Sequence, residues 1–196
     1  MRILLILALV TFFNFGFSQH KSSKVMYGVG YGYIQDGWGD IPGQTCYFNG
    51  LISTSKSWLT FNGRVLGTLI ERRTEYSPYT TFERSNGINT EFDVNFHLNL
   101  WKLNIYPSIG PTLRFSNEQH INYSSVGYDR FGQVVTFEVD YDKSRSVHLG
   151  YALGANIDLN IFKSLILGSR IAGMSYLNGN EYWYVALTLK NRNWRL

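Results

Sequence analysis

The sequence predicts an all-β fold, an antiparallel up-and-down β-barrel of eight strands. Three observations support this prediction: a composition rich in strand and turn residues, segments in which apolar and polar side chains alternate, and connections that are alternately short and long. The 196 residues include 14 Tyr, 13 Phe, 5 Trp and 19 Gly. Aromatic residues favour strands and glycine favours turns, and no long stretch has the periodicity of an amphipathic helix.

Alternation with a period of two is clearest from Val147 to Ile161. Polar or small residues such as His148 and Asp158 occupy one face of this segment. Strands in soluble domains average about 5 or 6 residues, so a two-faced strand of this length indicates a sheet whose faces meet very different surroundings. The apolar residues of the other face are Val147, Leu149, Tyr151, Leu153, Ala155, Ile157, Leu159 and Ile161.

Seven further segments have the pattern of strands. Residues 88–100 and 103–116 alternate in the same way, although Pro107 and Pro111 are unusual in a central strand because proline has no backbone N–H. The other expected strands are Val25–Ile34, Gln44–Thr54, Trp58–Ile70, Leu165–Leu177 and Glu181–Lys190.

The expected connections distinguish two kinds of barrel. Residues 55–57, 101–102 and 162–164 are tight turns, residues 35–43, 71–87 and 117–144 are long and polar, and the fourth outer loop, 178–180, is short. Transmembrane barrels have short periplasmic turns and longer extracellular loops, so the pattern predicts a transmembrane barrel with its apolar face toward lipid. The third loop is expected to hold a hairpin that continues the fifth and sixth strands beyond the membrane.

Aromatic residues near the expected strand ends fit the interfacial girdles of such barrels. A soluble lipocalin-type carrier of hydrophobic ligands would use the same alternation with the apolar face turned inward. Strand length, loop asymmetry and the small inward residues Gly28, Gly30 and Gly32 favour the membrane form. The expected girdle residues are Tyr33, Trp38, Trp58, Trp101, Phe162, Tyr176 and Trp183.

Residues 1–18 are expected to form a secretory signal peptide, because Arg2 precedes an apolar run and Gly16 and Ser18 offer small side chains for cleavage. Residues 19–196 then form a single barrel domain. The only cysteine, Cys46, excludes an intramolecular disulfide framework. The formal net charge of +4 is spread along the chain, which predicts no nucleic-acid partner.

This arrangement resembles the small outer-membrane barrels of the OmpX and OmpA type over roughly residues 24–190. The resemblance implies an eight-stranded barrel that reaches the outer membrane after export and contacts its lipid. Such barrels usually end in a strand with a terminal aromatic residue. Here the last expected strand alternates through Trp183, Val185 and Leu187, but the chain continues to Leu196, which departs from that pattern.

The interior of an eight-stranded barrel is just wide enough for side chains to fill it, and charges buried there must pair. The sequence therefore predicts a network of charged and polar groups that closes the lumen, with a narrow ion or small-solute channel as the alternative. The inward face also carries Arg72 and Lys190. The residues expected in the network are Arg64, Glu91, Asp93, His97, Arg114, His148, Asp158 and Arg170.

Specific binding is expected in the long loops, because loops held on a rigid scaffold commonly carry binding residues. This location predicts a non-enzymatic surface barrel that serves adhesion, binding of an extracellular protein or glycan, or envelope integrity. The aromatic residues expected to make these contacts are Tyr76, Tyr79, Phe82, Tyr123, Tyr128 and Phe131.

A lipid A-modifying enzyme is the remaining alternative, and it needs a nucleophile, a base and an orienting acid that converge. His97 shares a face with Asp93, and His148 shares one with Ser146, but no lipid-deacylase signature surrounds either histidine. The four histidines lack the close spacing of a metal site. No catalytic residue, metal or cofactor is therefore expected.

Overall fold

The computed structural model describes residues 25–37, 41–54, 58–100, 103–162 and 164–191. Among them, no helix has the length and hydropathy needed to cross a membrane. The expected signal peptide, Trp38, Trp101 and the expected turns 55–57 and 101–102 lie outside the described residues. The strands are β1 (Val25–Asp36), β2 (Pro42–Ser53), β3 (Leu59–Tyr76), β4 (Tyr79–Phe96), β5 (Leu98–Leu100), β6 (Leu103–Tyr128), β7 (Val134–Asn160), β8 (Leu165–Tyr176) and β9 (Glu181–Asn191).

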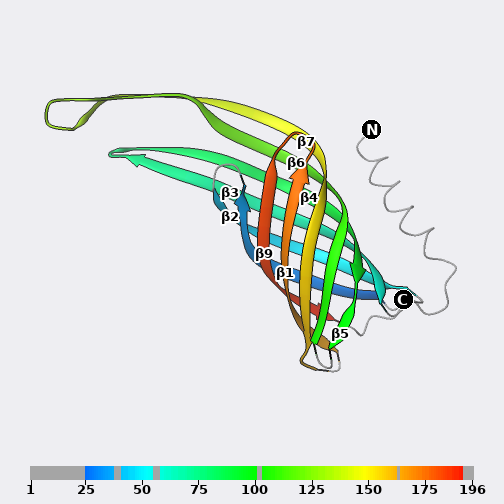
Figure 1. The fold of residues 1–196 in the computed structure, drawn as a ribbon. Helices are drawn as coiled ribbons and strands as arrows, with labels where there is room; N and C mark the ends of the chain where they lie inside the picture. The colour runs from blue at the N-terminus through cyan, green and yellow to red at the C-terminus, as the bar shows by residue number, and fades with distance from the viewer. Residues whose placement is uncertain (1–24, 38–40, 55–57, 101–102, 163, 192–196) are drawn as a thin grey trace.

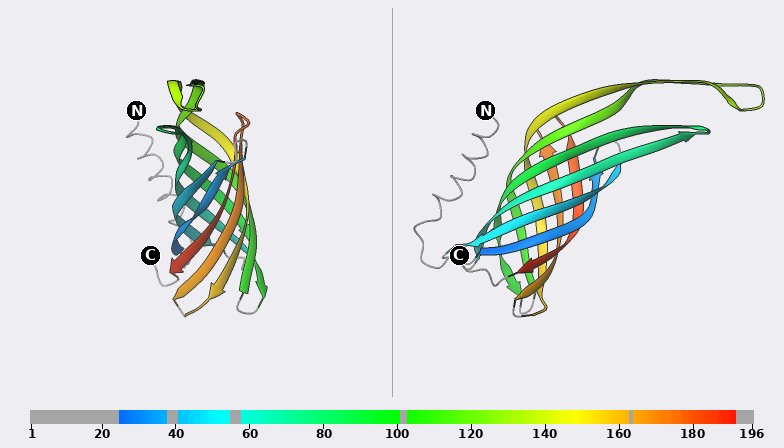
Figure 2. Two further views of the ribbon diagram at one scale, coloured as in Figure 1. Left: turned by 90° about the vertical axis from the view of Figure 1, so that its left-hand side faces the viewer. Right: turned by 180° about the vertical axis from the view of Figure 1, so that it is seen from behind.

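The strands form one antiparallel sheet that closes on itself. The strand order is β4-β3-β2-β1-β9-β8-β7-β6-β5, and β4 also pairs with β6. Figures 1 and 2 show the resulting barrel, with two hairpins projecting from one end. Consecutive strands pair with each other, except that β4 and β5 both pair with β6, and β1 pairs with β9 to complete the circle, so the up-and-down barrel topology is confirmed.

The nine elements amount to eight strands around the barrel, because β4 and β5 keep one register against β6 on both sides of His97. The break falls where Phe96 would face Pro107, and a second gap in the same ladder faces Pro111. Proline has no N–H to donate to a neighbouring strand. The two prolines therefore account for the interruptions, and the prediction of eight strands is confirmed.

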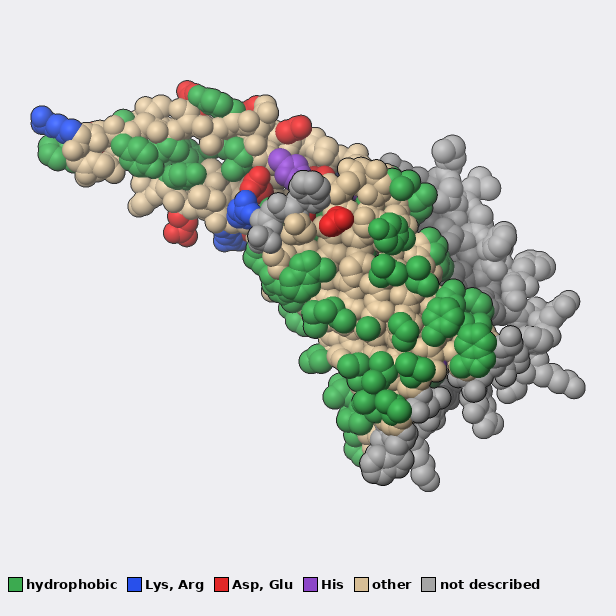
Figure 3. Space-filling model, viewed as in Figure 1, with side chains coloured by type: hydrophobic (Ala, Val, Ile, Leu, Met, Phe, Trp, Pro, Cys, Tyr) green, Lys and Arg blue, Asp and Glu red, His purple; other side chains and the backbone are tan. Residues whose placement is uncertain are grey.

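The two faces of the sheet differ as the alternation predicted. Apolar side chains on the outer wall remain exposed, for example 61% of Val147 and 66% of Leu187, whereas charged side chains on the inner wall are buried. Figure 3 shows hydrophobic side chains gathered over the barrel wall, with acidic and basic ones at the rim and on the projecting arm. A lipocalin-type carrier would have the opposite arrangement, so that alternative is wrong.

Four of the aromatic residues expected in the girdles are exposed, Tyr33 and Trp183 on strands of the outer wall and Trp58 and Phe162 in turns beside strand ends. The prediction for Tyr176 is wrong, because this side chain points into the lumen and is 3% exposed. Ala172 and Met174, which share a face of β8 with Tyr176, are apolar and also buried in the lumen. An aromatic residue near a strand end can face either side of the barrel wall, so residue type alone did not show that Tyr176 faces the lumen.

The lumen contains an apolar layer toward the end that carries the hairpins, and this layer was not predicted. Gly30 on β1 makes room for one of its rings, because a Cβ at this glycine would lie 2.2 Å from the Tyr47 ring. The layer therefore fills the lumen with packed side chains. Its buried members are Ile34, Ile41, Tyr47, Leu66, Ile70, Ala152, Ala172, Met174, Tyr176, Tyr182, Tyr184 and Ala186.

Two hairpins extend beyond the barrel, and Figure 1 shows them side by side. The prediction that residues 71–87 form a loop is wrong, because β3 and β4 stay paired until Tyr76 faces Tyr79. The hairpin predicted in the third loop is confirmed, because β6 and β7 pair as far as Tyr128 and Val134. We call residues 71–84 the short arm and residues 118–143 the long arm.

Two of the outer turns contain a glycine with a positive φ. Gly179, in the short turn between β8 and β9, has a φ of 89°, and Gly132, at the tip of the long arm, has a φ of 79°. Side-chain-bearing residues rarely adopt these values. The short fourth outer loop is confirmed, since only residues 177–180 separate β8 from β9.

Candidate functional sites in the lumen and on the arms

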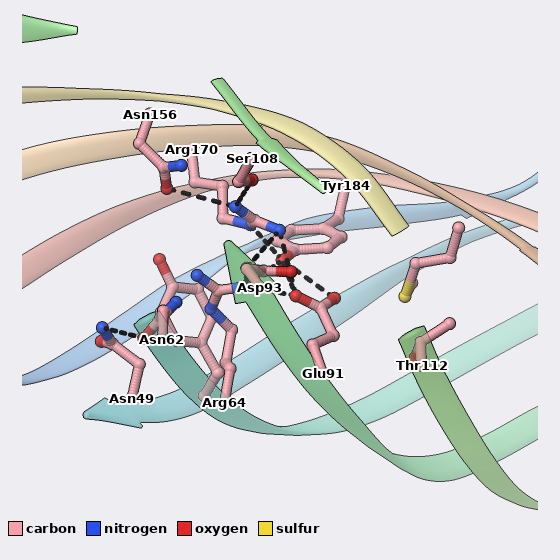
Figure 4. A network of polar contacts seen from close by, with 12 residues as sticks. Asn49, Asn62, Arg64, Glu91, Asp93, Ser108, Thr112, Asn156, Arg170 and Tyr184 are labelled. Carbon is pink, nitrogen blue, oxygen red and sulfur yellow. Dashed lines mark hydrogen bonds and ion pairs between the residues drawn. The ribbon is translucent and has the colours of Figure 1, made fainter. Parts of the chain in front are cut away.

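A charge cluster fills the lumen near its middle, and four of the expected network residues form it. Arg64 contacts Glu91 and lies 2.9 Å from Asp93. Arg170 lies 3.0 Å from Glu91 and 3.2 Å from Asp93. Figure 4 shows these side chains, which come from β3, β4 and β8, pointing toward one another. Each residue is 4% exposed or less, so two cations and two anions compensate each other away from water.

Tyr184 of β9 completes this central cluster, and the sequence analysis missed it. Its hydroxyl donates to Glu91 at 3.2 Å and accepts from Nε of Arg170 at 2.6 Å. Arg170 also donates to Ser108 at 2.8 Å and to Asn156 at 3.3 Å. Alternation along β9 carried the signal that this tyrosine faces inward, because both of its neighbours face lipid.

A second group lies nearer the end of the barrel with the short turns. Lys190 lies 2.6 Å from Asp158 and contacts the hydroxyl of Tyr106, which donates to Asp158 at 2.9 Å. The ring of His97 stacks on Tyr106 with centres 4.5 Å apart, and its Nε2 lies 2.7 Å from Oγ1 of Thr60. Two expected network residues, Asp158 and His97, therefore meet at this level rather than in the central cluster.

Arg114 is buried among neutral partners. It donates to Thr68 at 2.9 Å, to Asn89 at 3.1 Å and to Oγ of Ser85 at 3.0 Å. Its guanidinium lies 4.4 Å from the centre of the Tyr182 ring, within cation–π distance. Hydrogen bonds and an aromatic face thus hold this positive charge in the lumen.

Ser146 and His148 form a hydrogen-bonded pair at the outer rim. Oγ of Ser146 lies 2.7 Å from Nε2 of His148 and 2.9 Å from Oγ of Ser116. Oε1 of Glu118 lies 3.9 Å from the same Nε2. A hydrolytic triad places its acid on the other ring nitrogen, Nδ1. The geometry therefore suits a polar network better than an activated nucleophile.

Aromatic stacking joins the two arms. The rings of Tyr79 and Phe137 lie 5° from parallel with centres 4.5 Å apart, and Tyr76 lies 5.9 Å from the same ring. Phe82 stacks on Tyr141 at 5.7 Å, and its backbone N–H donates to the Tyr141 hydroxyl at 3.4 Å. The three aromatic residues expected to bind a partner from the second loop therefore bind the long arm, which makes the two hairpins one projecting unit.

The other three expected contact residues are exposed along the outer part of the long arm. The exposed fractions are 55% for Tyr123, 57% for Tyr128 and 74% for Phe131. β7 pairs with β8 only from Gly150 onward, so within the described residues no strand lies beside the far edge of residues 134–148. A free strand edge offers backbone N–H and C=O groups to another chain.

Ion pairs hold the short arm together. Glu71 accepts hydrogen bonds from Arg73 at 2.5 Å and from Arg84 at 2.6 Å. The bond from Arg73, followed by that from Arg84, lowers the pKa of Glu71 below its usual value, so this carboxylate stays ionised at neutral pH. Arg72 was expected on the inward face of the barrel, which is wrong: it lies on the short arm, 3.6 Å from Glu83, with 43% of its side chain exposed.

Phe137→Ala is expected to loosen the junction between the arms. Loss of the Tyr79 stack, worth about 0.5–1.5 kcal/mol beyond area burial, should speed trypsin cleavage at Arg73 about two- to tenfold. Phe131→Ala is the matched control, because it removes the same side chain at the exposed tip. Equal cleavage rates for the two variants would show that stacking does not couple the arms.

No protein-family model and no curated protein matches the sequence. The structure is similar to that of neisserial surface protein A, with a TM-score of 0.57 and 7% identity over 87% of this chain and 96% of that one. A major outer membrane protein from Thermus thermophilus gives a TM-score of 0.51 and 12% identity over 85% and 98%. The outer membrane enzyme PagL gives 0.42 and 15% over 83% and 97%.

At these identities the likenesses bear on the fold alone. The closed strand order, the apolar outer wall and the similarity to the first two structures agree with one another. The protein is a closed eight-stranded antiparallel barrel with the fold of the small outer-membrane β-barrels.

Proposed function

We propose that the protein is a non-enzymatic outer-membrane barrel whose joined arms bind an extracellular protein. The observation that carries this proposal is the long arm, a paired projection with exposed aromatic residues near its tip and a free edge along β7. Adhesion is the role that such a projection serves best. The barrel below it is a scaffold, and its packed lumen supports a closed path rather than a channel.

Three features of the long arm suit strand addition by an extended segment of the partner. The free edge of β7 supplies main-chain hydrogen bonds, and Tyr123, Tyr128 and Phe131 supply the aromatic anchors that interfaces favour. Glu138, Asp140 and Asp142 alternate along one face of β7 and are exposed, so a basic segment fits best. Stacking on the short arm holds the surface in place before binding, which lowers the entropic cost of association.

A chain that lacks residues 120–140 tests the proposal. Gln119 pairs with Lys143 in the ladder, so the deletion leaves these residues joined by two others, the length of a tight hairpin turn. Substituting Tyr141→Asn and Asp142→Gly gives that turn a favourable sequence. We expect the shortened barrel to fold, as shown by a heat-dependent gel shift, and to lose binding to protein-coated surfaces and to cells.

The triple variant Tyr123→Ser, Tyr128→Ser and Phe131→Ser keeps the arm and removes its aromatic anchors. We expect it to bind at least about tenfold more weakly, since loss of one interface hot spot costs about 2 kcal/mol or more. Binding of the shortened chain equal to that of the full chain would end the proposal. Binding that survives protease treatment of the target but not removal of its sugars would replace the protein partner with a glycan.

A further inference from the structure

A groove on the outer wall of the barrel is distinct from the arms and the lumen. It has a volume of about 600 Å³, within the range of small-molecule sites. Its lining comes from β1, β2, β3, β4, β6 and β7. Gly67 has no side chain and lies between the large side chains of Tyr31, Ile88 and Phe115. The missing side chain leaves a depression in this part of the wall.

The groove is apolar toward the middle of the barrel and polar toward the arms. In the ladder Ile88 faces Phe115, and two positions nearer the arms Asn86 faces Asn117, which in turn faces Arg145. All five residues line the groove. An occupant that fits both ends must therefore be amphiphilic, with its polar part at the outer rim of the membrane.

The charge at the polar end selects for an anion. Arg145 is exposed, and among the described residues no acidic group pairs with it. Lys143 lies two positions further along the same face of β7 and is also exposed. An arginine guanidinium matches the geometry of a phosphate group, and the amides of Asn86 and Asn117 can both donate and accept hydrogen bonds with sugar hydroxyls.

We propose that this groove binds a phosphorylated glycolipid of the outer leaflet. One acyl chain lies over Gly67 between Ile88 and Phe115, the sugar contacts the two asparagine amides, and a phosphate binds Arg145. The barrel thereby holds one specific lipid at the base of its arms, beyond the general contact that every membrane protein makes with lipid.

Cys46 lines the groove and is exposed, so its thiol reports occupancy. The full chain in phosphatidylcholine nanodiscs is labelled with a maleimide while bis-phosphorylated lipid A is added. We expect lipid A to slow labelling and the same mole fraction of phosphatidylglycerol to leave the rate unchanged. Arg145→Gln should weaken the lipid A effect about tenfold, the loss expected for one charge-assisted hydrogen bond; Arg130→Gln, at the arm tip, is the control.

Filling the groove tests the acyl-chain position independently of the thiol. A Cβ at Gly67 would meet only ordinary contacts, the nearest being Sγ of Cys46 at 3.6 Å, so Gly67→Leu fills the groove without a backbone clash. Gly173→Leu adds the same side chain at an exposed position of β8 with nothing within 4 Å. Native mass spectrometry should show lipid A retained by Gly173→Leu and lost from Gly67→Leu.

Equal retention by the two leucine variants would overturn the site. Equal protection of Cys46 by phosphatidylglycerol would overturn the glycolipid assignment. An unchanged response of Arg145→Gln would overturn the phosphate position.

Discussion

Glu91→Gln is expected to lower the free energy of unfolding of the barrel by about 3–5 kcal/mol, the range for breaking a buried ion pair by removing one partner. The substitution leaves Arg64 and Arg170 buried beside one remaining carboxylate, Asp93. Glutamine preserves the shape of the side chain, so the change reports the lost charge. Urea titration in detergent micelles, followed by the heat-dependent gel shift, measures the difference in unfolding midpoint.

Glu83→Gln is the matched control for this experiment. Glu83 pairs with Arg72 on the short arm, where the two side chains are 22% and 43% exposed, and an exposed pair contributes about 0–1 kcal/mol. If the two variants unfolded at the same urea concentration, the central cluster would not be what stabilises the lumen.

Removing Glu91 and Arg170 together is expected to open the lumen. The double variant Glu91→Ala with Arg170→Ala subtracts one charge of each sign and leaves Arg64 paired with Asp93 at 2.9 Å. It therefore creates space in the middle of the barrel without leaving a buried charge unpaired. In planar bilayers we expect no steady open level from the native chain and stepwise currents from the double variant.

The control removes the exposed pair on the short arm by Arg72→Ala with Glu83→Ala, an equal change in composition far from the lumen. Like the native chain, this control variant should produce no steady current across the bilayer. A steady open level in the native chain would contradict a closed lumen, and a folded double variant without current would show that other layers, such as the apolar one, close it.

Alternation located strands wherever the two faces of the sheet differ in polarity. In β7, for example, Val147 faces lipid and His148 faces inward, as predicted. Where the two faces have the same polarity, the sequence does not alternate and gives no sign of a strand. Glu71 and Arg72 are consecutive charged residues on a paired strand, so the short arm had the composition of a loop. Leu66 faces the lumen and its neighbour Val65 faces lipid. Because both residues are apolar, this part of the strand does not alternate, and the sequence contains no sign of the apolar layer in the lumen.

For the candidate sites, the sequence predicts which side of the barrel wall a residue faces, but it does not predict which residues are in contact. Alternation placed Arg64, Glu91 and Asp93 on the inward side, but which groups meet depends on strand tilt and on the path across the lumen. Arg170 and Glu91 are 79 positions apart in the sequence, and no pattern in the sequence indicates that two residues this far apart are in contact. The aromatic residues of the short arm were recognised as contact residues, although their partners belong to this same chain.

The length of β7 sets where the proposed binding surface operates. The strand has 27 residues, a contour of about 90 Å at the usual rise per residue, whereas a tilted strand crosses a bilayer in about 9–11 residues. More than half of β7 therefore stands outside the hydrocarbon, braced by the short arm where Tyr79 meets Phe137. The long arm carries Phe131 at its tip, between the ends of β6 and β7, so a partner would reach the proposed binding surface without approaching the bilayer.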